Sequence, residues 1–307
     1  MVAVHRDLSP QDIVQRIQEL SPALLPHPTE VEPHLPRLDT VKAVLFDVYG
    51  TLFVSEAGEI GTTESDVHRT AFVEALQSAG FTFADRHIGN AISRYGELNR
   101  QQRQCLRDQG IDHPEMDIVA LWRDLLVPLQ EQGALFGKIS DEAIQRVAIE
   151  YEYRLNKASL MPGFHETLDA LRFAQIPFGL ISNAQFYSLY LFDAFAGKSV
   201  RACGFEPGLT SWSFECGASK PSQIIFDPVL QGLSELNLEP HQALYVGNDM
   251  KNDVHGAAKQ GMKTALFAGD ARSLRLREDD PSLNGTQPDV VLTELAQLKV
   301  VLGLERI

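Results

Sequence analysis

Five short apolar runs constrain the fold more than any other feature of this sequence. The runs are VKAVLFD at residues 41–47, IPFGLIS at 176–182, QALYVG at 242–247, MKTALF at 262–267 and DVVL at 289–292. Segments with helical periodicity, such as FHETLDALRFA at 164–174 and PSQIIFDPVLQGL at 221–233, lie between the runs. Apolar strands that alternate with helices are typical of a parallel sheet with both faces covered. The sequence therefore predicts an α/β fold with a Rossmann-like parallel sheet as its core.

Residues 64–158 follow a different pattern. Four stretches in this region carry helical periodicity, and no strand-like run interrupts them. We therefore expect an all-helical domain at residues 64–158, inserted just after the first strand. The α/β core would then consist of residues 41–63 and 159–307.

A separate segment, residues 1–40, precedes the first predicted strand. Residues 9–20 predict a short amphipathic helix, with Ser9 as its cap and Pro10 in its first turn. Several prolines then interrupt regular structure up to residue 36. We expect residues 1–40 to form an appendage and linker wrapped on the main body. A disordered or partner-binding tail is the alternative.

The charge of the chain limits its partners. The formal net charge is -14 at pH 7. Nucleic acids and anionic membranes select basic surfaces, so this charge argues against both partners. It does not exclude a small anionic substrate, because a metal ion or a few lysines can reverse the field locally. The sequence does not indicate an oligomeric state.

Several features favour a cytoplasmic location. No stretch approaches the roughly 20 apolar residues that a membrane-spanning helix needs, and residues 1–10 do not resemble a signal peptide. The three cysteines, Cys105, Cys203 and Cys216, give neither a disulfide framework nor zinc-ligand spacing. We expect them to be reduced thiols.

Polar residues follow the predicted strands at the positions where open parallel sheets bind ligands. Most stand directly after a strand, and one lysine stands before a helix. The residues at these positions are Asp47, Ser182, Asn183, Lys220, Asn248, Asp249 and Asp253. Because the carboxyl ends of parallel strands meet at one edge of a sheet, we expect these side chains to converge on one crevice.

Four segments around these residues resemble the ordered motifs of a known family. FDVYGTL, ISNA, ASKPS and VGNDMKNDVHGA are similar to the four motifs of the haloacid dehalogenase superfamily, and they fall within residues 41–267. The helical insert lies where this family places its first-type cap. The resemblance implies a hydrolase in which Asp47 is the nucleophile and forms a covalent aspartyl intermediate.

The same resemblance assigns roles to further residues. Asp47, Tyr49 and Lys220 are the implied catalytic positions, with Lys220 offsetting the negative charge of nucleophile and substrate. The positions implied to bind the substrate are Gly50, Thr51, Ser182, Asn183 and Lys220. Ser182 and Asn183 would donate hydrogen bonds to a phosphoryl or carboxylate oxygen.

A magnesium site is also implied by the resemblance. Mg²⁺ would be held by Asp47, by the backbone carbonyl of Tyr49 and by Asp249, with Asp253 in support. The fourth motif of the family usually opens with Gly-Asp, whereas this chain has Asn248 at that place and Asp249 after it. Either Asp249 takes the ligand role, or Asn248 is a weaker ligand. The spacing to Asp253 favours Asp249.

Tyr49 departs from the pattern of the family's phosphatases. They carry a second aspartate at this position, which protonates the leaving group and then activates water. Tyrosine has an ordinary pKa near 10 and is a poor base at neutral pH. The 2-haloacid dehalogenases of the family also have tyrosine here, because a halide leaves without a proton. They use an arginine to hold the halide, for which Arg69 and Arg94 are weak candidates.

These observations favour a Mg²⁺-dependent phosphohydrolase that acts on a small phosphorylated metabolite. Substrates with good leaving groups, such as acyl phosphates, would depend least on the missing aspartate, and His68 of the predicted cap is a candidate proton donor. One alternative is a metal-independent 2-haloacid dehalogenase, which would release halide in the presence of a chelator. The other is a catalytically weak protein of the same fold that binds a ligand or partner.

Overall fold

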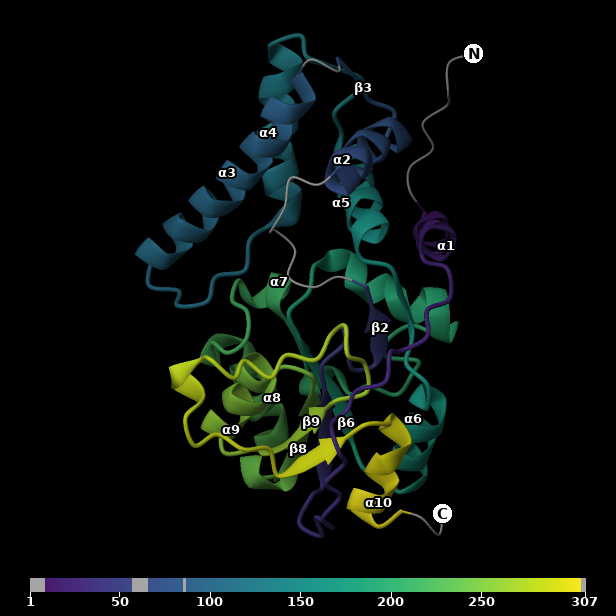
Figure 1. Cartoon of the computed structure of the whole chain (residues 1–307), viewed down its shortest axis with the longest axis vertical. Helices are drawn as coiled ribbons and strands as arrows, with labels where there is room; N and C mark the ends of the chain where they lie inside the picture. The colour runs from purple at the N-terminus through teal and green to yellow at the C-terminus, as the bar shows by residue number, and fades with distance from the viewer. Residues whose placement is uncertain (1–8, 57–65, 85–86, 305–307) are drawn as a thin grey trace.

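The computed structural model describes residues 9–56, 66–84 and 87–304. Figure 1 shows an α/β core at the bottom and a group of helices above it. The core sheet has six strands in the order β10-β9-β8-β1-β6-β7, and every pair of neighbours is parallel. Its strands are β1 (Ala43–Phe46), β6 (Phe178–Ser182), β7 (Thr210–Trp212), β8 (Ala243–Gly247), β9 (Lys263–Phe267) and β10 (Val290–Leu292). The predicted α/β class with a parallel sheet is confirmed.

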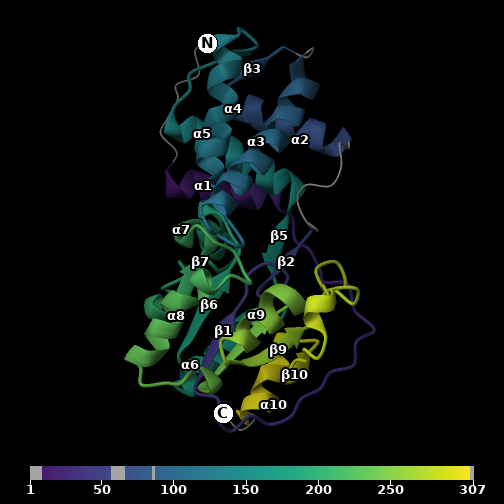
Figure 2. The ribbon, with the colours of Figure 1, turned by 90° about the vertical axis from the view of Figure 1, so that its left-hand side faces the viewer.

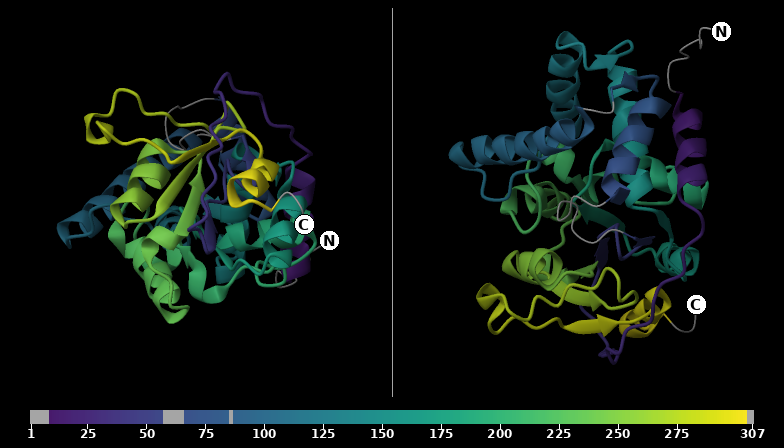
Figure 3. Two further views of the ribbon diagram at one scale, coloured as in Figure 1. Left: turned by 90° about the horizontal axis from the view of Figure 1, so that it is seen from below. Right: turned by 45° about the horizontal axis from the view of Figure 1, so that its top comes forward.

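The side chains of β1 point alternately into two apolar clusters, one on each face of the sheet, so both faces are covered. Val44 and Phe46 belong to the larger cluster, and Ala43 and Leu45 belong to the smaller one. Two helices, α6 (Phe164–Phe173) and α10 (Leu298–Leu302), contribute to the larger cluster. Two others, α8 (Gln223–Glu235) and α9 (Gly256–Lys259), contribute to the smaller one. Figure 3 shows these helices around the sheet from below.

The upper part of the molecule is built mainly from four helices. They are α2 (Asp66–Ser78), α3 (Ile88–Asp108), α4 (Ile118–Glu131) and α5 (Asp141–Leu155). Their shared core contains the buried Trp122 and Phe72, whose rings lie 5.5 Å apart. The helical prediction for this region needs one correction, because two short strands, β3 (Thr82–Phe83) and β4 (Leu135–Phe136), pair antiparallel between the helices. Each has only two residues, which is too short to give a strand pattern in the sequence.

Two chain segments connect this part to the core. They form β2 (Phe53–Ser55) and β5 (Ala158–Leu160), which pair antiparallel. β2 leads out of the core after the segment that follows β1, and β5 leads back into α6. The helices therefore lie above the carboxyl end of β1.

The N-terminal segment lies against both the helical part and the core of the molecule. Its helix α1 (Pro10–Leu20) has a capping box between Ser9 and Asp12. The guanidinium of Arg16 on α1 pairs with Glu150 of α5, with Nε 2.7 Å from Oε1. Residues 21–41 then continue along the core, where His34 forms a β-bridge with Val291 (Figure 2).

The described residues also bear on two other predictions, the absence of a membrane-spanning helix and the state of the cysteines. None of their helices is both long and apolar enough to cross a membrane. Cys105, Cys203 and Cys216 are free thiols, and Cys203 is buried.

Candidate active site

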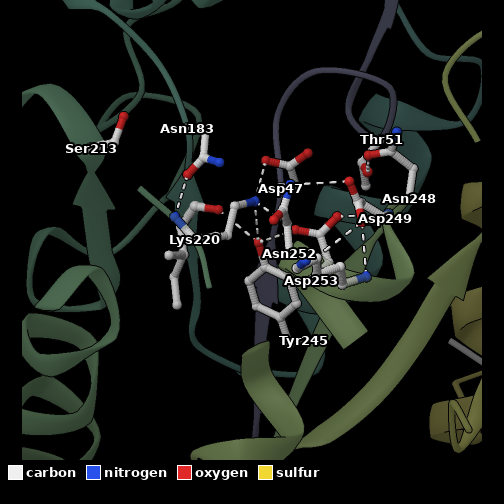
Figure 4. Close-up of polar contacts among 12 residues, drawn as sticks. Asp47, Thr51, Asn183, Ser213, Lys220, Tyr245, Asn248, Asp249, Asn252 and Asp253 are labelled. Atoms are coloured by element: carbon white, nitrogen blue, oxygen red, sulfur yellow. Dashed lines mark hydrogen bonds and ion pairs between the residues drawn. The ribbon is translucent and has the colours of Figure 1, made fainter. Parts of the chain in front are cut away.

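The predicted polar residues are positioned at the carboxyl edge of the sheet. Asp47 directly follows β1, and its backbone N–H donates to Val246 of β8 at 2.9 Å, so the position of Asp47 is fixed by the strand ladder. Asn183 follows β6, and Lys220 stands shortly before α8. These residues line a cavity of about 1360 Å³ between the core and the helices. Figure 4 shows the polar contacts among them.

Lys220 is the centre of this cluster and is almost fully buried. Its ammonium group donates to Asp47 Oδ1 at 2.7 Å and to Asp253 Oδ1 at 2.6 Å. A third bond, of 2.8 Å, reaches the hydroxyl of Tyr245. Burial alone would lower the pKa of Lys220, but the charges of Asp253 and Asp47 raise it above its ordinary value. The lysine therefore carries a positive charge beside Asp47.

Asp253 belongs to this cluster and lines the cavity from a buried position. It is 1% exposed, and its Oδ2 accepts the backbone N–H of Asp249 at 2.9 Å. Burial raises its pKa, which the neighbouring Lys220 ammonium offsets only in part. Both oxygens of Asp253 thus have protein partners, and its main effect is to hold Lys220 in place.

Asp249 has its carboxylate fully engaged by protein groups. Its Oδ1 caps the N-terminus of the short helix η6 (Met250–His255) by accepting the N–H groups of Lys251 and Asn252 at 2.8 and 3.1 Å. Its Oδ2 accepts from the Arg277 guanidinium at 2.7 Å and from the Asn252 amide at 3.0 Å. Arg277 has a positive φ of 56°, a conformation that is costly for a non-glycine residue. The carboxylate is thereby neutralised.

Asn248 is held by neighbouring groups in a different way. Its Nδ2 donates to the carbonyl of Ser273 at 2.5 Å, which fixes the orientation of the amide. Its Oδ1 has one weak partner, the Thr51 hydroxyl at 3.4 Å. Gly50 has a φ of +80°, and a Cβ there would lie 2.6 Å from Asn248 Nδ2, so only glycine fits. Gly50 and Thr51 therefore lie against Asn248 and are not among the residues that line the cavity, and their expected role as substrate-binding positions stays a prediction.

Only one member of the Ser182-Asn183 pair reaches the cavity. Asn183 lines it and accepts the backbone N–H of Lys220 at 2.7 Å through Oδ1, which leaves the amide nitrogen for a ligand. Ser182 is the last residue of β6 and is 0% exposed. Its hydroxyl has no hydrogen-bond partner among the residues that the structure describes. The expected contact of Ser182 with the substrate stays a prediction.

The Tyr49 hydroxyl is unsuited to proton transfer. It bonds to the Ser188 hydroxyl at 2.8 Å, and burial together with the nearby Glu152 raises its pKa well above the ordinary value. Tyr49 nevertheless lines the cavity. Its side chain stays neutral across the physiological range and donates or accepts only as a hydroxyl.

A buried polar network joins the core to the helices beside Tyr49. The Tyr187 hydroxyl donates to Glu152 Oε2 at 2.9 Å, and Asn156 Nδ2 donates to Glu152 Oε1 at 3.0 Å. Ser55 of β2 donates to Asn156 Oδ1 at 2.7 Å. Burial raises the pKa of Glu152 above its ordinary value. The network lies where β2 and α5 meet the core.

The cap residues considered from the sequence lie in different places. His68 lines the cavity, with Nδ1 3.3 Å from the Tyr151 hydroxyl. Arg69 and Arg94 are exposed and do not line it, and Arg94 pairs with Glu97 at 3.1 Å. Neither arginine is thus in a position to hold a halide near Asp47.

Sequence reasoning missed several residues of this cavity. Tyr245 contacts Lys220 from inside β8, and its only signal was a hydroxyl within an apolar run. Arg275 and Arg277 line the cavity from the segment between β9 and β10. Their signal was a cluster of arginines, RSLRLR at 272–277, in an acidic chain.

A protein-family model matches this chain. The model for haloacid dehalogenase-like hydrolases matches residues 41–261, which is more than half of the sequence, and the chain belongs to this family of hydrolases. Two curated relatives are phosphatases by name. Glyceraldehyde 3-phosphate phosphatase of Pyrococcus furiosus is 27% identical over 211 residues, covering 62% of this chain and 79% of that protein. Phospholysine phosphohistidine inorganic pyrophosphate phosphatase of Danio rerio is 24% identical over 254 residues, covering 74% and 82%.

Solved structures of similar chains include a phosphatase and a dehalogenase. A haloacid dehalogenase-type phosphatase from Thermococcus onnurineus aligns with a TM-score of 0.49 and 20% identity, covering 87% of this chain and 100% of that chain. A 2-haloacid dehalogenase from Pseudomonas syringae pv. Tomato DC3000 aligns with a TM-score of 0.47 and 23% identity, covering 85% and 97%.

Proposed function

We propose that this hydrolase is a phosphohydrolase that acts on a small phosphorylated metabolite through a covalent intermediate on Asp47. The observation that carries the proposal is the buried Lys220, which bonds to both Asp47 and Asp253 at the edge of the cavity. The phosphatase names of the two curated relatives support the same reaction class. The cavity lies between core and cap, which suits a substrate that is enclosed during turnover.

The two carboxylate oxygens of Asp47 differ in their contacts, and we expect them to differ in their roles. Oδ1 accepts from Lys220, so Oδ2 would attack phosphorus while the bond to the leaving oxygen breaks. The Asn183 amide nitrogen would donate to a phosphoryl oxygen. The positive charge of Lys220, whose three N–H groups already have protein acceptors, would offset the charge of the phosphoryl group. Water would then attack the aspartyl phosphate, releasing inorganic phosphate and the free carboxylate.

The leaving group determines which substrates fit this site. An alkoxide needs a proton, and Tyr49 is a poor donor of it because burial raises the pKa of its hydroxyl. A carboxylate leaves an acyl phosphate without a proton. We therefore expect acyl phosphates to be hydrolysed faster than alkyl phosphates.

Magnesium belongs to the proposal as the expected cofactor of the family. No three His, Cys, Asp or Glu side chains of the described residues form a group that would hold a metal ion. Mg²⁺ commonly needs only one or two carboxylates, with waters and phosphate oxygens completing its shell. The Asp47 carboxylate, the Tyr49 carbonyl and the Asn248 amide oxygen fit that requirement, whereas Asp249 is engaged by Arg277. When bound, the ion would neutralise charge on the phosphoryl oxygens.

Phosphate release tests this function. Acetyl phosphate and a panel of phosphomonoesters would be incubated with Mg²⁺ and either the native chain or Asp47→Asn. The proposal predicts release by the native chain, fastest from acetyl phosphate, and none above background in the variant. Equal release by both proteins, or none from any substrate, would rule it out.

The 2-haloacid dehalogenase alternative has one observation in its favour, the tyrosine at position 49. Arg69 and Arg94, which were considered for halide binding, do not line the cavity. Halide release from 2-chloropropionate that persists with a chelator would support this alternative. Tight binding of a phosphorylated ligand without any product would instead support a binding protein.

A further inference from the structure

The cavity that contains Asp47 extends well beyond the nucleophile. Its volume of about 1360 Å³ exceeds the roughly 300–1,000 Å³ of typical small-molecule pockets. The polar cluster around Lys220 occupies only its core end. The opposite side is lined by α3, which projects from the other cap helices over the core (Figure 1). The part of a substrate that is not the phosphoryl group would therefore face this helix.

Three arginines of α3 line this side of the cavity. They are Arg100, Arg103 and Arg107. Spacings of three and four residues place them on one face of the helix. At 1.5 Å per residue, the first and last are separated by about 10 Å along the axis. The helix thus presents a strip of guanidinium groups to the cavity.

The cations at the two ends of the cavity differ in their partners. At the core end, Lys220 and Arg277 each pair with a carboxylate. On α3, Arg103 is oriented by two neutral acceptors: its Nε donates to Asn99 Oδ1 and its Nη1 to the Pro114 carbonyl, each at 2.9 Å. Its contact with a carboxylate, Glu115 Oε1, is longer, at 4.0 Å. Within residues 9–56, 66–84 and 87–304, Arg100 and Arg107 have neither a hydrogen bond nor an ion pair through their side chains.

Three acids, Glu97, Glu115 and Glu152, also line this cavity, and each has partners of its own. Glu97 pairs with Arg94 at 3.1 Å. Burial raises the pKa of Glu115, which accepts from the Ser213 hydroxyl at 2.8 Å, and burial likewise raises the pKa of Glu152. The cap side of the cavity therefore presents Arg100 and Arg107 without a carboxylate partner among the described residues, in a chain whose net charge is -14. Charge of one sign in a concave site concentrates ligands of the opposite sign.

We propose that the Arg100, Arg103 and Arg107 face of α3 is a binding subsite for a second anionic group of the substrate, a carboxylate or a second phosphate. Planar guanidinium groups bind both kinds of anion through paired hydrogen bonds. The inference rests on the proposed function, because the first anionic group is the phosphoryl that Asp47 attacks. It narrows the substrate class to small phosphorylated metabolites with an additional acidic group.

A matched set of substrates and variants tests the subsite. Phosphate release would be measured from ethyl phosphate, which lacks a second anion, from 2-phosphoglycolate and 3-phosphoglycerate, which add a carboxylate, and from 1,3-propanediol bisphosphate. The variants are Arg100→Gln/Arg107→Gln and, as control, Arg94→Gln. Arg94 lies on the same helix but does not line the cavity.

The proposal predicts a KM that rises about tenfold or more for at least one of the doubly anionic substrates in the double variant, with kcat within about twofold. The value of kcat/KM for ethyl phosphate would be unchanged, and Arg94→Gln would behave as the native chain. A carboxylate subsite and a phosphate subsite are distinguished by which substrates respond. An equal effect on all substrates, or no effect on any, would overturn the proposal.

Binding separates a failure of the subsite from a failure of the proposed function. If no ester releases phosphate, calorimetry with inorganic phosphate, 2-phosphoglycolate and 1,3-propanediol bisphosphate would be done on the same proteins. The subsite predicts that at least one doubly anionic ligand binds the native chain more tightly than phosphate does, and that the double variant loses this difference. Equal affinity of all three ligands for the native chain would overturn it.

Discussion

Two neighbouring residues, Asn248 and Asp249, are both candidates for the proposed magnesium site, and their contacts differ. The spacing to Asp253 favoured Asp249 as a magnesium ligand. In the folded chain, the Asp249 oxygens cap a helix and pair with Arg277. Asn248 keeps an amide oxygen with a single weak partner. The distinction depends on contacts with residue 277, which is distant in sequence, so spacing alone could not reveal it.

Asn248→Asp tests this assignment. The change adds a carboxylate beside Asp47, so we expect Mg²⁺ to bind about tenfold more tightly, which corresponds to about 1.4 kcal/mol. Calorimetric titration with MgCl₂ measures the effect without any substrate. Asp249→Asn is the comparison. It should reduce thermal stability by removing the charge that pairs with Arg277, since asparagine keeps an oxygen for the helix cap, and it should change Mg²⁺ affinity little. The opposite pattern would return the ligand role to Asp249.

Tyr49→Asp tests the missing acid. Aspartate at this position would supply the proton that an alkoxide leaving group needs, worth about 10²-fold in general acid catalysis. We expect kcat on alkyl phosphates to rise by this order and kcat on acetyl phosphate to change much less. Tyr49→Phe, which removes only the hydroxyl, should change neither substrate by more than a few-fold. A Tyr49→Asp protein that folds but gains nothing would mean that the tyrosine serves another chemistry.

At the scale of elements, the strand and helix pattern predicted five of the six core strands. β7 was missed because TSW is three residues long, and two of them are polar. The pattern also located the helices of the cap. It could not give the strand order, because neighbouring strands such as β1 and β8 are nearly 200 residues apart and pair only in the folded chain.

The helix α1 was predicted, but its docking on α5 was not. The Arg16–Glu150 pair that holds it joins residues 134 positions apart. Ile17 of α1 is fully buried in the larger apolar cluster. Replacing it with alanine should lower the free energy of unfolding by about 2–4 kcal/mol. Urea denaturation measures this, with the exposed Gln15→Ala as the control.

A cost below about 0.5 kcal/mol for Ile17→Ala, typical of surface positions, would show that the N-terminal helix does not stabilise the rest of the molecule. The segment would then behave as a tail, which is the alternative interpretation of residues 1–40 and their prolines.

The network at the junction of β2 and α5 predicts a pH effect. Burial raises the pKa of Glu152, so the native state binds this proton more tightly than the unfolded chain does. Stability from this group is therefore present at low pH and lost as pH rises from the ordinary glutamate value, about 4.3, through the raised native value. Glutamine at position 152 cannot ionise, so the Glu152→Gln variant does not lose this stability. The difference in stability between the variant and the native chain should therefore grow in favour of the variant from pH 5 to pH 8. Parallel stability curves in thermal unfolding would contradict this account.

At the scale of the whole molecule, the core half of the cavity could be predicted and the cap half could not. Asp47, Asn183 and Lys220 follow from the rule that ligands meet strand ends in parallel sheets. The α3 arginines and Glu152 depend on how the cap helices rotate and pack. Helical periodicity identifies a face of α3, but it does not say which face turns toward the core.

The measurement that tests the central claim most directly is identification of the covalent intermediate. The native chain would be mixed with acetyl phosphate and Mg²⁺, quenched in acid within one turnover, digested and examined by mass spectrometry. The account predicts a phosphoryl group on the peptide that contains Asp47, and none in Asp47→Asn. Phosphate release without any phosphorylated peptide, or with the label on another residue, would contradict Asp47 as the nucleophile.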